Sequence, residues 1–230
     1  MKVQVAPDIR SVDDFGDHIA VRGYQNYNAY ADRLEPVGDG QQHAWANTNA
    51  KWSAVDSVLG DLDGVKTYAD LGCNLGLYVM TAAINHGLTA TGYDYDKTYI
   101  QVCNTVKDKF SLPCDFTTKP FSEVDETYDC VSALGLIHHL YHHTESYGNL
   151  GSIMQQLAGL TNRYLILEFP NEHDPKAMKW VNLEGRIKNG EYSEAELLRV
   201  ARQHFGTITV TGRVHPDRPI FLMDKGPASC

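Results

Sequence analysis

The segment at residues 68–76, Tyr-Ala-Asp-Leu-Gly-Cys-Asn-Leu-Gly, constrains the fold of this chain more than any other. It joins a short apolar strand, predicted at residues 65–71, to a helix predicted at 75–86, for which Gly87 is a natural C-cap. Glycines in such a turn let the backbone approach a ligand closely, and the helix begins with free N–H groups. This order of strand, glycine turn and helix is typical of an open α/β sheet that binds a ligand where its strands end.

The alternation of strands and helices continues along the chain. Further helices are predicted at residues 52–62, 96–110, 150–160 and 193–205, and further strands at 89–93, 113–117, 130–136 and 164–169. Two closing strands, at 207–211 and 219–223, have no helix between them and predict an antiparallel hairpin. The pattern predicts an α/β fold with a mostly parallel seven-stranded sheet, an antiparallel hairpin at its edge and helices on both faces.

Residues 1–48 differ from the rest of the chain. They hold several Tyr, Asn and Gln residues and a Gly-Asp-Gly turn, but no sustained hydrophobic period. We expect an irregular or partly helical segment that packs on the main domain. The predicted organisation is therefore a lead-in or cap at 1–48, followed by one domain at 49–230.

Charge and cysteine usage narrow the classes of partner and location. Lys and Arg number 20 against 29 Asp and Glu, a net charge of -9. Affinity for a phosphate backbone comes largely from Lys and Arg, so a nucleic-acid partner is disfavoured. The 5 cysteines include no CxxC pair, and their odd number argues against a disulfide framework. No signal-peptide pattern or apolar run of membrane-spanning length is present, so we expect a cytoplasmic protein.

Two carboxylates mark a ligand site at the ends of the first two strands. Asp94 ends the second strand about 20 residues after the glycine turn, a spacing that suits a grip on ribose hydroxyls. Asp70 lies two positions before the first glycine, where the dinucleotide-binding pattern has no acid. A carboxylate there suits a cofactor that carries an ammonium and a sulfonium rather than a pyrophosphate.

This arrangement, Asp-x-Gly-x-x-x-Gly followed by Gly92-Tyr-Asp94, resembles motif I and its acidic partner in class I S-adenosylmethionine-dependent methyltransferases. The resemblance implies a Rossmann-like class I methyltransferase fold, with S-adenosylmethionine as cofactor. The cofactor-binding residues it implies are Asp70, Gly72, Cys73, Asn74, Gly76, Asp94, Tyr95, Leu134 and Lys51. Asn74 stands where the family commonly has glycine; because asparagine tolerates a left-handed backbone, the turn is expected to persist.

The predicted strand at 130–136 leads into Leu136-Ile137-His138-His139. In the methyltransferase family this loop runs under the methyl donor and borders the acceptor. The resemblance implies that His139, with His138 as second candidate, orients an acceptor hydroxyl or takes its proton, since imidazole titrates near neutral pH. A solvated histidine-rich loop is an open alternative. A metal site with His142 and His143 is disfavoured, because no Cys or Asp lies at a fitting spacing, and we expect no metal.

Later polar residues belong to the same edge of the predicted sheet. Glu168 lies at the end of the predicted strand at 164–169 and is a catalytic candidate, which would bind the acceptor or pair with a nearby base. An equally open alternative is that Glu168 has a structural role and accepts hydrogen bonds from loop N–H groups. Arg218, with His215, is a candidate to bind a phosphate or carboxylate of the substrate. The alternative for Arg218 is a surface residue paired with Asp217 or Asp224.

Four segments carry a closer resemblance: Asp70-Leu-Gly-Cys, Gly92-Tyr-Asp, Leu136-Ile-His-His and the tail at 214–222. Together they resemble the methyltransferase domain that caps bacterial O-antigen polysaccharides, and related nodulation-type methyltransferases. The resemblance implies O-methylation of a glycan, a sugar or a small hydroxylated metabolite. In the capping relatives an aromatic and a basic residue ahead of the core close over the cofactor, which here points to Tyr24 or Tyr27 and to Lys51.

Three other functions stay open at this point. One is a non-catalytic scaffold or binding subunit that has kept the cofactor fold, because fold alone does not fix function. Another is a methyltransferase that acts on RNA or protein, although the chain shows neither a basic excess nor an Asn-Pro-Pro-Tyr motif after the fourth strand. A nucleotide-dependent oxidoreductase is disfavoured by the acid at position 70 and by the lack of glycine at 74.

Overall fold

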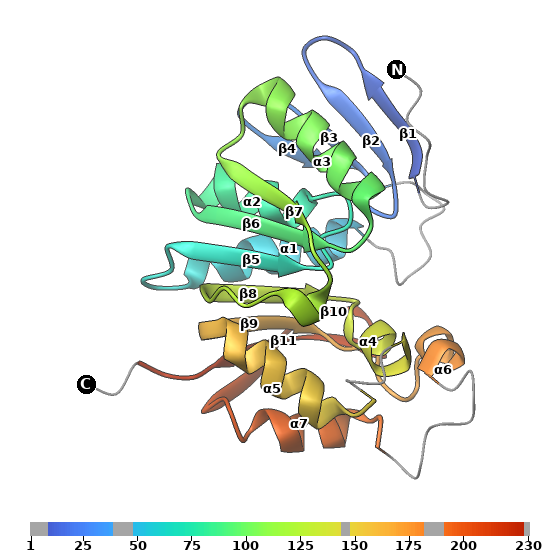
Figure 1. The fold of residues 1–230 in the computed structure, drawn as a ribbon, viewed down its shortest axis with the longest axis vertical. Coiled ribbons are helices and arrows are strands. Elements are labelled where there is room, and N and C mark those ends of the chain that lie inside the picture. Colours follow the sequence, from blue (N-terminus) through green and yellow to red (C-terminus); the bar gives the residue numbers. More distant parts are fainter. Residues whose placement is uncertain (1–8, 39–47, 144–147, 182–190, 228–230) are drawn as a thin grey trace. The chain divides into compact units, whose positions relative to one another are not determined.

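The computed structural model of the chain describes residues 9–38, 48–143, 148–181 and 191–227 (Figure 1). The chain forms two compact units, Met1–Val124 and Asp125–Cys230. The predicted division into a lead-in at 1–48 and a domain at 49–230 stays a prediction, since compactness alone does not show which segments fold independently.

The first unit begins with a small antiparallel sheet. Its strands, in the order β1-β2-β3-β4, are β1 (Ile9–Asp14), β2 (Ile19–Gly23), β3 (Tyr27–Ala29) and β4 (Leu34–Pro36). The expectation of an irregular or partly helical lead-in is therefore wrong. Ile19, Ala20 and Val21 of β2 are buried in succession, and β3 buries Tyr27 and Ala29. However, strands of three to six residues are too short to display a period of two clearly in the sequence.

Three parallel strands follow in the same unit. The elements are α1 (Thr48–Asp61), β5 (Thr67–Leu71), α2 (Leu77–His86), β6 (Thr89–Asp94), α3 (Lys97–Phe110), β7 (Cys114–Thr118) and a short 3-10 turn at Phe121–Glu123. β6 pairs in parallel with both β5 and β7, side by side in Figure 1. α2 packs on β5 and β6, and α3 packs on β6 and β7. α2 ends at Gly87 in a left-handed conformation, as the sequence predicts.

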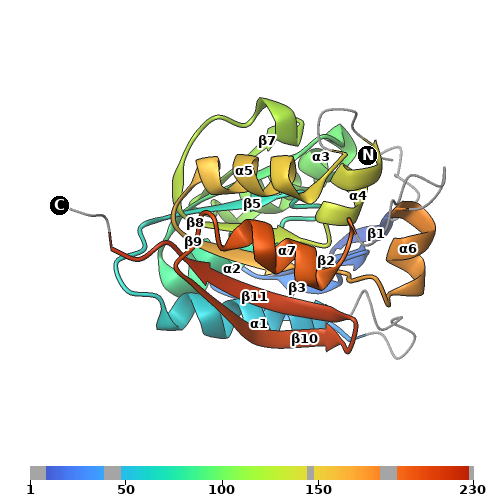
Figure 2. The ribbon, with the colours of Figure 1, turned by 90° about the horizontal axis from the view of Figure 1, so that it is seen from below.

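The second unit contributes four strands in the order β10-β11-β9-β8. Its elements are β8 (Tyr128–Leu134), α4 (Ile137–His143), α5 (Leu150–Leu160), β9 (Thr161–Glu168), α6 (Pro175–Val181), α7 (Glu194–Ala201), β10 (Thr207–His215) and β11 (Arg218–Asp224). β8 and β9 are parallel, whereas β11 is antiparallel to both β9 and β10. The closing hairpin of β10 and β11 is visible in Figure 2.

These elements confirm the predicted fold class, a Rossmann-like class I methyltransferase fold with seven strands and an antiparallel edge hairpin. Ser193 caps the start of α7, since its hydroxyl accepts a hydrogen bond from the Glu196 N–H at 3.1 Å. The sequence analysis missed α4 and α6. The second had a signal, because Asp174 followed by Pro175 is a typical helix start.

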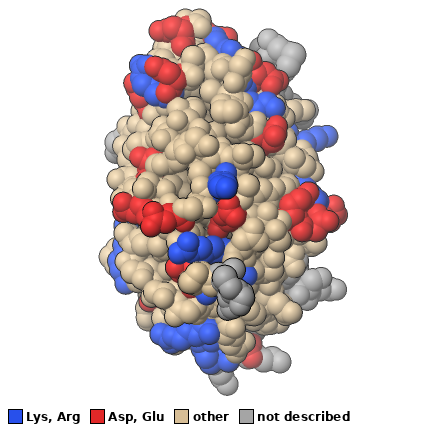
Figure 3. All heavy atoms as spheres, turned by 90° about the vertical axis from the view of Figure 1, so that its left-hand side faces the viewer, with Lys and Arg blue, Asp and Glu red and all other residues tan. Residues whose placement is uncertain are grey.

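The surface and the helices bear on the classes of partner. On the face that Figure 3 shows, the described basic side chains lie in separate small groups among acidic ones. A phosphate backbone is best bound by a continuous basic stripe, and this face offers none among its described residues. Within the part of the chain that the structure describes, no helix has both the length and the apolar character needed to cross a bilayer.

Candidate functional site

The turn between β5 and α2 has a special backbone. Gly72, Asn74 and Gly76 all adopt left-handed conformations, with φ values of 72°, 49° and 81°. Asparagine is one of the few residues with a side chain that enters this region readily, which explains how Asn74 replaces the usual glycine. Three left-handed residues among five turn the chain sharply, so the peptide groups of the turn point in fixed directions.

Most of the backbone donors of this turn are bonded within the protein. The five N–H groups concerned belong to Gly72, Cys73, Asn74, Gly76 and Leu77. The first two donate to the Tyr93 carbonyl at 2.8 and 2.9 Å. The others donate to the Asp94 carboxylate, the Cys73 carbonyl and the Gln25 side chain at 2.9, 2.9 and 3.0 Å, respectively. Phosphate-binding turns need such N–H groups for the phosphate oxygens, so these five are not available to an anion.

Two buried carboxylates flank the turn. Asp70 lies near the end of β5, and Asp94 is the last residue of β6. Because β5 and β6 are parallel neighbours, both side chains lie toward the same edge of these strands. Asp94 accepts hydrogen bonds from the N–H groups of Asn74 and Asp96, both at 2.9 Å. Burial raises the pKa of Asp94 above its usual value, although these N–H bonds act in the opposite direction.

Gly76 and Gly92 allow neighbouring side chains to pack closely against the backbone near the turn. A Cβ atom on Gly76 would meet Phe116 at 2.8 Å and Cys103 at 2.9 Å, and one on Gly92 would meet Phe116 at 2.7 Å and Cys73 at 2.9 Å. Burial raises the pKa of the Cys73 thiol well above its usual value, which keeps this thiol protonated. Cys73 is therefore a small packing residue under the turn and not a nucleophile.

Gly76→Ala should destabilise the protein by about 3 kcal/mol. The alanine would have to adopt a left-handed backbone conformation, and its Cβ would clash with the neighbouring side chains. Urea unfolding measures the loss. Gly87→Ala is the matched control: its φ is also positive, at 64°, but its Cβ would meet nothing within 4 Å. Equal losses in the two variants would contradict the role assigned to Phe116 and Cys103.

The remaining cofactor candidates of the first unit fall into different environments. The Lys51 ammonium is buried on α1 and donates to the Tyr24 hydroxyl at 3.3 Å. Tyr27 is fully buried, and its hydroxyl donates to the Leu75 carbonyl at 2.6 Å. Of the two tyrosines considered as a cover for the cofactor, Tyr27 is thus committed to the backbone. Tyr95, next to Asp94, is 80% exposed.

In the second unit, the acceptor-side candidates gather where β8 and β9 end. Leu134 and Glu168 are register partners at these ends. α4 begins three residues after Leu134 and places a buried His138 beside an exposed His139, with ring centroids 4.1 Å apart. Among the side chains that the structure describes, no group of three or more His, Cys, Asp and Glu is arranged to hold a metal ion.

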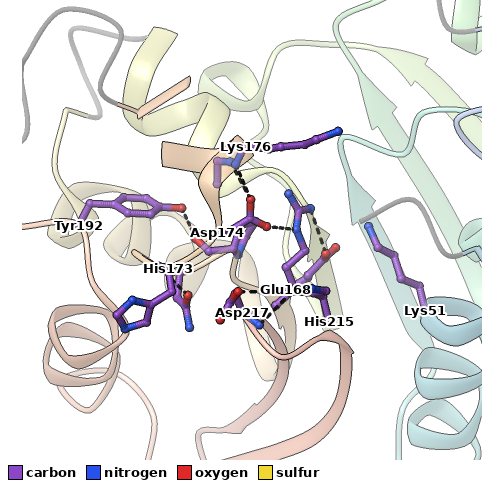
Figure 4. Close-up of polar contacts among 12 residues, drawn as sticks. Lys51, Glu168, His173, Asp174, Lys176, Tyr192, His215 and Asp217 are labelled. Atoms are coloured by element: carbon purple, nitrogen blue, oxygen red, sulfur yellow. Dashed lines mark hydrogen bonds and ion pairs between the residues drawn. The ribbon is translucent and has the colours of Figure 1, made fainter. Parts of the chain in front are cut away.

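A buried ionic network lies next to these residues (Figure 4). The Arg218 guanidinium, 3% exposed, donates to the carboxylate of Asp174 and lies 3.5 Å from that of Glu168, which is 0% exposed. Asp174 also accepts from the Lys176 and Ala177 N–H groups, both at 2.9 Å, and so caps α6. Burial would raise the pKa of Asp174, but the bonds from Arg218 and these N–H groups outweigh it and lower the pKa.

This network corrects one interpretation of the sequence and selects among others. Arg218 is not a surface residue paired with Asp217 or Asp224, because β11 turns it inward. Of the alternatives for Glu168, pairing with a base is the one found. His215 is half-exposed on β10 and lies 3.5 Å from the Asp217 carboxylate. Direct contact of Arg218 or His215 with a substrate stays a prediction.

Two residues of these sites were missed from the sequence. Gln25 has no local signal, since its partners lie 48 and 52 residues further along the chain. Asp174 has one: an Asp before Pro at a helix start offers a carboxylate to N–H groups and to a nearby cation. What the sequence cannot show is that this cation is Arg218, 44 residues away.

Comparisons with known proteins add to this geometry. Residues 69–156 match the family model of a methyltransferase domain. A search of curated protein sequences finds no match. Among solved structures, WbdD in complex with the kinase inhibitor LY294002 is similar at 20% identity and a TM-score of 0.55, over 83% of this chain and 42% of that one. The chain thus spans less than half the length of that protein.

A second solved protein matches over most of both chains. Magnesium protoporphyrin IX methyltransferase (ChlM) from Synechocystis PCC 6803, with bound SAM, is 20% identical with a TM-score of 0.56, over 82% of this chain and 87% of that one. The same protein with bound SAH is 20% identical with a TM-score of 0.58, over 82% and 90%. At these identities the likeness shows a shared fold, while the family match bears on β5 to α5.

Proposed function

We propose that this chain is a class I S-adenosylmethionine-dependent methyltransferase, which transfers the methyl group to a hydroxyl oxygen of a sugar, a glycan or a small hydroxylated metabolite; the match of residues 69–156 to a methyltransferase domain and the shared fold support this. The observation that carries the cofactor side is the turn after β5, whose N–H groups are bonded internally while two buried carboxylates flank it. Such a site favours a ligand with hydroxyl and ammonium donors over one with phosphates. A cytoplasmic location, predicted from the scattered cysteines, belongs to the same proposal.

On the cofactor side, each residue of the first unit has a distinct task. Asp94 accepts hydrogen bonds from the ribose hydroxyls, for which its carboxylate has lone pairs beyond those that already accept backbone N–H groups. Asp70 and the Gly72 backbone hold the methionine end. The exposed ring of Tyr95 lies next in sequence to the ribose acid and offers a face to the adenine. Bound S-adenosylmethionine supplies a methyl group activated by the positive sulfonium.

On the acceptor side, His139 is the residue that meets the hydroxyl. It is exposed on α4, whereas His138 is buried against it and limits its movement. A neutral imidazole can orient the hydroxyl or take its proton as the new C–O bond forms. Glu168 and Arg218 are too deeply buried to meet a large acceptor, so we assign them a positioning task. The half-exposed His215 remains the candidate for a second contact with the acceptor.

The acceptor class follows from the resemblance to polysaccharide-capping and nodulation-type methyltransferases, and from the acidic charge of the chain. WbdD, described elsewhere as a bifunctional kinase-methyltransferase, shares the fold with this chain at 19% identity and a TM-score of 0.54. A net charge of -9 disfavours RNA as the acceptor. A hydroxylated small molecule or a glycan needs no basic surface.

Calorimetric titration with S-adenosylmethionine, S-adenosylhomocysteine and NAD tests the cofactor side. We expect the first two to bind and NAD to give no heat of binding. Transfer of a labelled methyl group to a panel of sugars and glycans, with RNA and protein extracts as alternatives, tests the acceptor. Label in RNA or protein alone would overturn the acceptor class. Binding without transfer to any acceptor would favour the non-catalytic scaffold.

His139→Ala should reduce turnover by about 100-fold or more, since a positioned acid–base group contributes 10²–10⁴-fold. Affinity for S-adenosylhomocysteine should not change, because the proposed cofactor residues that hold the ribose and methionine lie in the first unit. Initial rates at saturating S-adenosylmethionine measure the effect. His204→Ala, in the turn three residues after α7, is the control and should retain full turnover. Wild-type rates in the His139 variant would remove this residue from the mechanism.

A further inference from the structure

The small N-terminal sheet reaches the cofactor turn through one buried side chain. Gln25, in the connection between β2 and β3, is only 4% exposed. Its amide nitrogen donates to the Cys73 carbonyl at 3.2 Å, and its amide oxygen accepts from the Leu77 N–H at 3.0 Å. One side chain thus bonds both the first half of the turn and the first residue of α2.

The connection that carries Gln25 is itself held firmly. The Asn26 side chain accepts from the Gly23 N–H at 3.0 Å, and the Asn26 carbonyl accepts from the Val37 N–H at 2.9 Å. Two residues after Gln25, the fully buried Tyr27 donates its hydroxyl to the Leu75 carbonyl at 2.6 Å. The sheet therefore makes three hydrogen bonds to the backbone of the turn, at positions 73, 75 and 77.

These bonds have a direct effect on the ribose acid. The Asn74 N–H that reaches Asp94 lies between the two atoms that Gln25 bonds. A shift of the turn would move this N–H and with it the carboxylate. Gln25 also occupies the N–H of Leu77, at the start of a helix where a free N–H would attract an anion.

We propose that Gln25 is a positioning residue for the methyl donor, which fixes the cofactor turn from the N-terminal sheet without touching the cofactor. Tyr27 assists it through the Leu75 carbonyl. The inference rests on the proposed function, since it assumes that this turn binds S-adenosylmethionine. It gives the segment before residue 48 a task in cofactor binding that is distinct from closing over the ligand.

Gln25→Met is the decisive variant, because methionine has a similar size but neither the donor nor the strong acceptor. It leaves the Cys73 carbonyl and the Leu77 N–H without their partner in a buried place, which the turn can relieve only by moving. We expect the Kd for S-adenosylhomocysteine to rise about tenfold, equivalent to about 1.4 kcal/mol. Tyr27→Phe, which removes one hydroxyl, should raise it by a smaller factor of about three.

Asn28→Ala is the matched control. It removes the hydrogen bond from Arg22 to Asn28, 2.8 Å long, which lies within the same sheet and does not reach the turn. A purely structural role of the sheet would lower the melting temperature of all three variants and leave their Kd values alike. The proposal instead requires that Asn28→Ala retain the wild-type Kd, whatever its melting temperature.

The experiment is calorimetric titration of the whole chain and its three variants with S-adenosylhomocysteine, at a temperature at which each apo protein is folded. Weaker binding by the Gln25 and Tyr27 variants alone supports the proposal. Wild-type affinity in Gln25→Met, or equal weakening in Asn28→Ala, overturns it. If Gln25→Met does not fold, Tyr27→Phe decides by the same criterion. Failure of the wild-type chain to bind would instead overturn the proposed function, and this inference with it.

Discussion

Asp94→Ala should abolish measurable binding of S-adenosylhomocysteine. The substitution removes the proposed acceptor for both ribose hydroxyls, and hydrogen bonds to a charged group contribute about 1.5–3 kcal/mol each. In the wild-type protein the Asn74 and Asp96 N–H groups donate to this carboxylate. The substitution removes both hydrogen bonds, so the turn also loses a contact that fixes its position. Two such losses correspond to a Kd at least 100-fold higher. Calorimetry and the shift of melting temperature on adding ligand both measure it.

Asp96→Ala is the control for this variant. Asp96 lies two residues further on and caps α3 by accepting from the Thr98 N–H at 2.8 Å, so its loss costs stability of about 1 kcal/mol. Asp96 has no assigned contact with the cofactor. The Asp96→Ala variant should therefore bind S-adenosylhomocysteine with wild-type affinity. If Asp94→Ala bound S-adenosylhomocysteine as tightly as Asp96→Ala, the ribose assignment would be wrong.

The ionisation of Asp94 adds a pH dependence to the same result. Burial raises its pKa above the usual 3.8, although N–H groups of Asp96 and Asn74 oppose the shift. The ribose needs the ionised carboxylate, so wild-type affinity should fall as the pH decreases through this raised pKa. The Asp94→Ala variant should lack that dependence.

Arg218→Met should destabilise the second unit by about 3–5 kcal/mol, the typical loss when one partner of a buried ion pair is removed. The variant leaves Glu168 and Asp174 buried without the cation that lies between them. Urea unfolding measures the change. Arg213→Met is the control, because that arginine is exposed on β10 and donates to the Pro216 carbonyl at 2.8 Å. A loss no larger than the control's would show that the network contributes little.

The same variant should respond to pH in a defined direction. Arg218 helps to keep the pKa of Asp174 below 3.8 in the folded protein. The stability that this pairing contributes is therefore present above pH 3.8 and is lost as the pH falls through the lower folded pKa. Without Arg218, protonation of Asp174 removes its uncompensated buried charge. The difference between wild type and variant should thus shrink toward acid pH.

The parts of the fold that the sequence predicted are those with local causes. The turn from β5 into α2 was predicted because its glycines, its Asn74 and the following helix lie within about 15 residues of one another. Asp94 was found because a strand end about 20 residues after the turn has a fixed place in such sheets. The hairpin of β10 and β11 followed from the lack of a helix between two apolar runs.

The parts that were missed depend on contacts between distant residues. The N-terminal strands are too short to carry a visible period, and they form a sheet only because each pairs with its neighbour. Nothing near Gln25 indicates that it will meet Cys73 and Leu77. The sequence offered Asp217 and Asp224 as partners of Arg218, as the alternative to substrate binding, whereas the antiparallel pairing of β11 with β9 brings it to Glu168.

The internal bonding of the cofactor turn also limits how this protein can change. The N–H groups of Gly72 and Cys73 donate to the Tyr93 carbonyl, on the neighbouring strand β6. Exchange of Asp70 and Asp94 for the residues of a dinucleotide-binding protein would alter the side chains but would not release these donors. We therefore expect that substitution of these two carboxylates alone would not create a phosphate site at this turn.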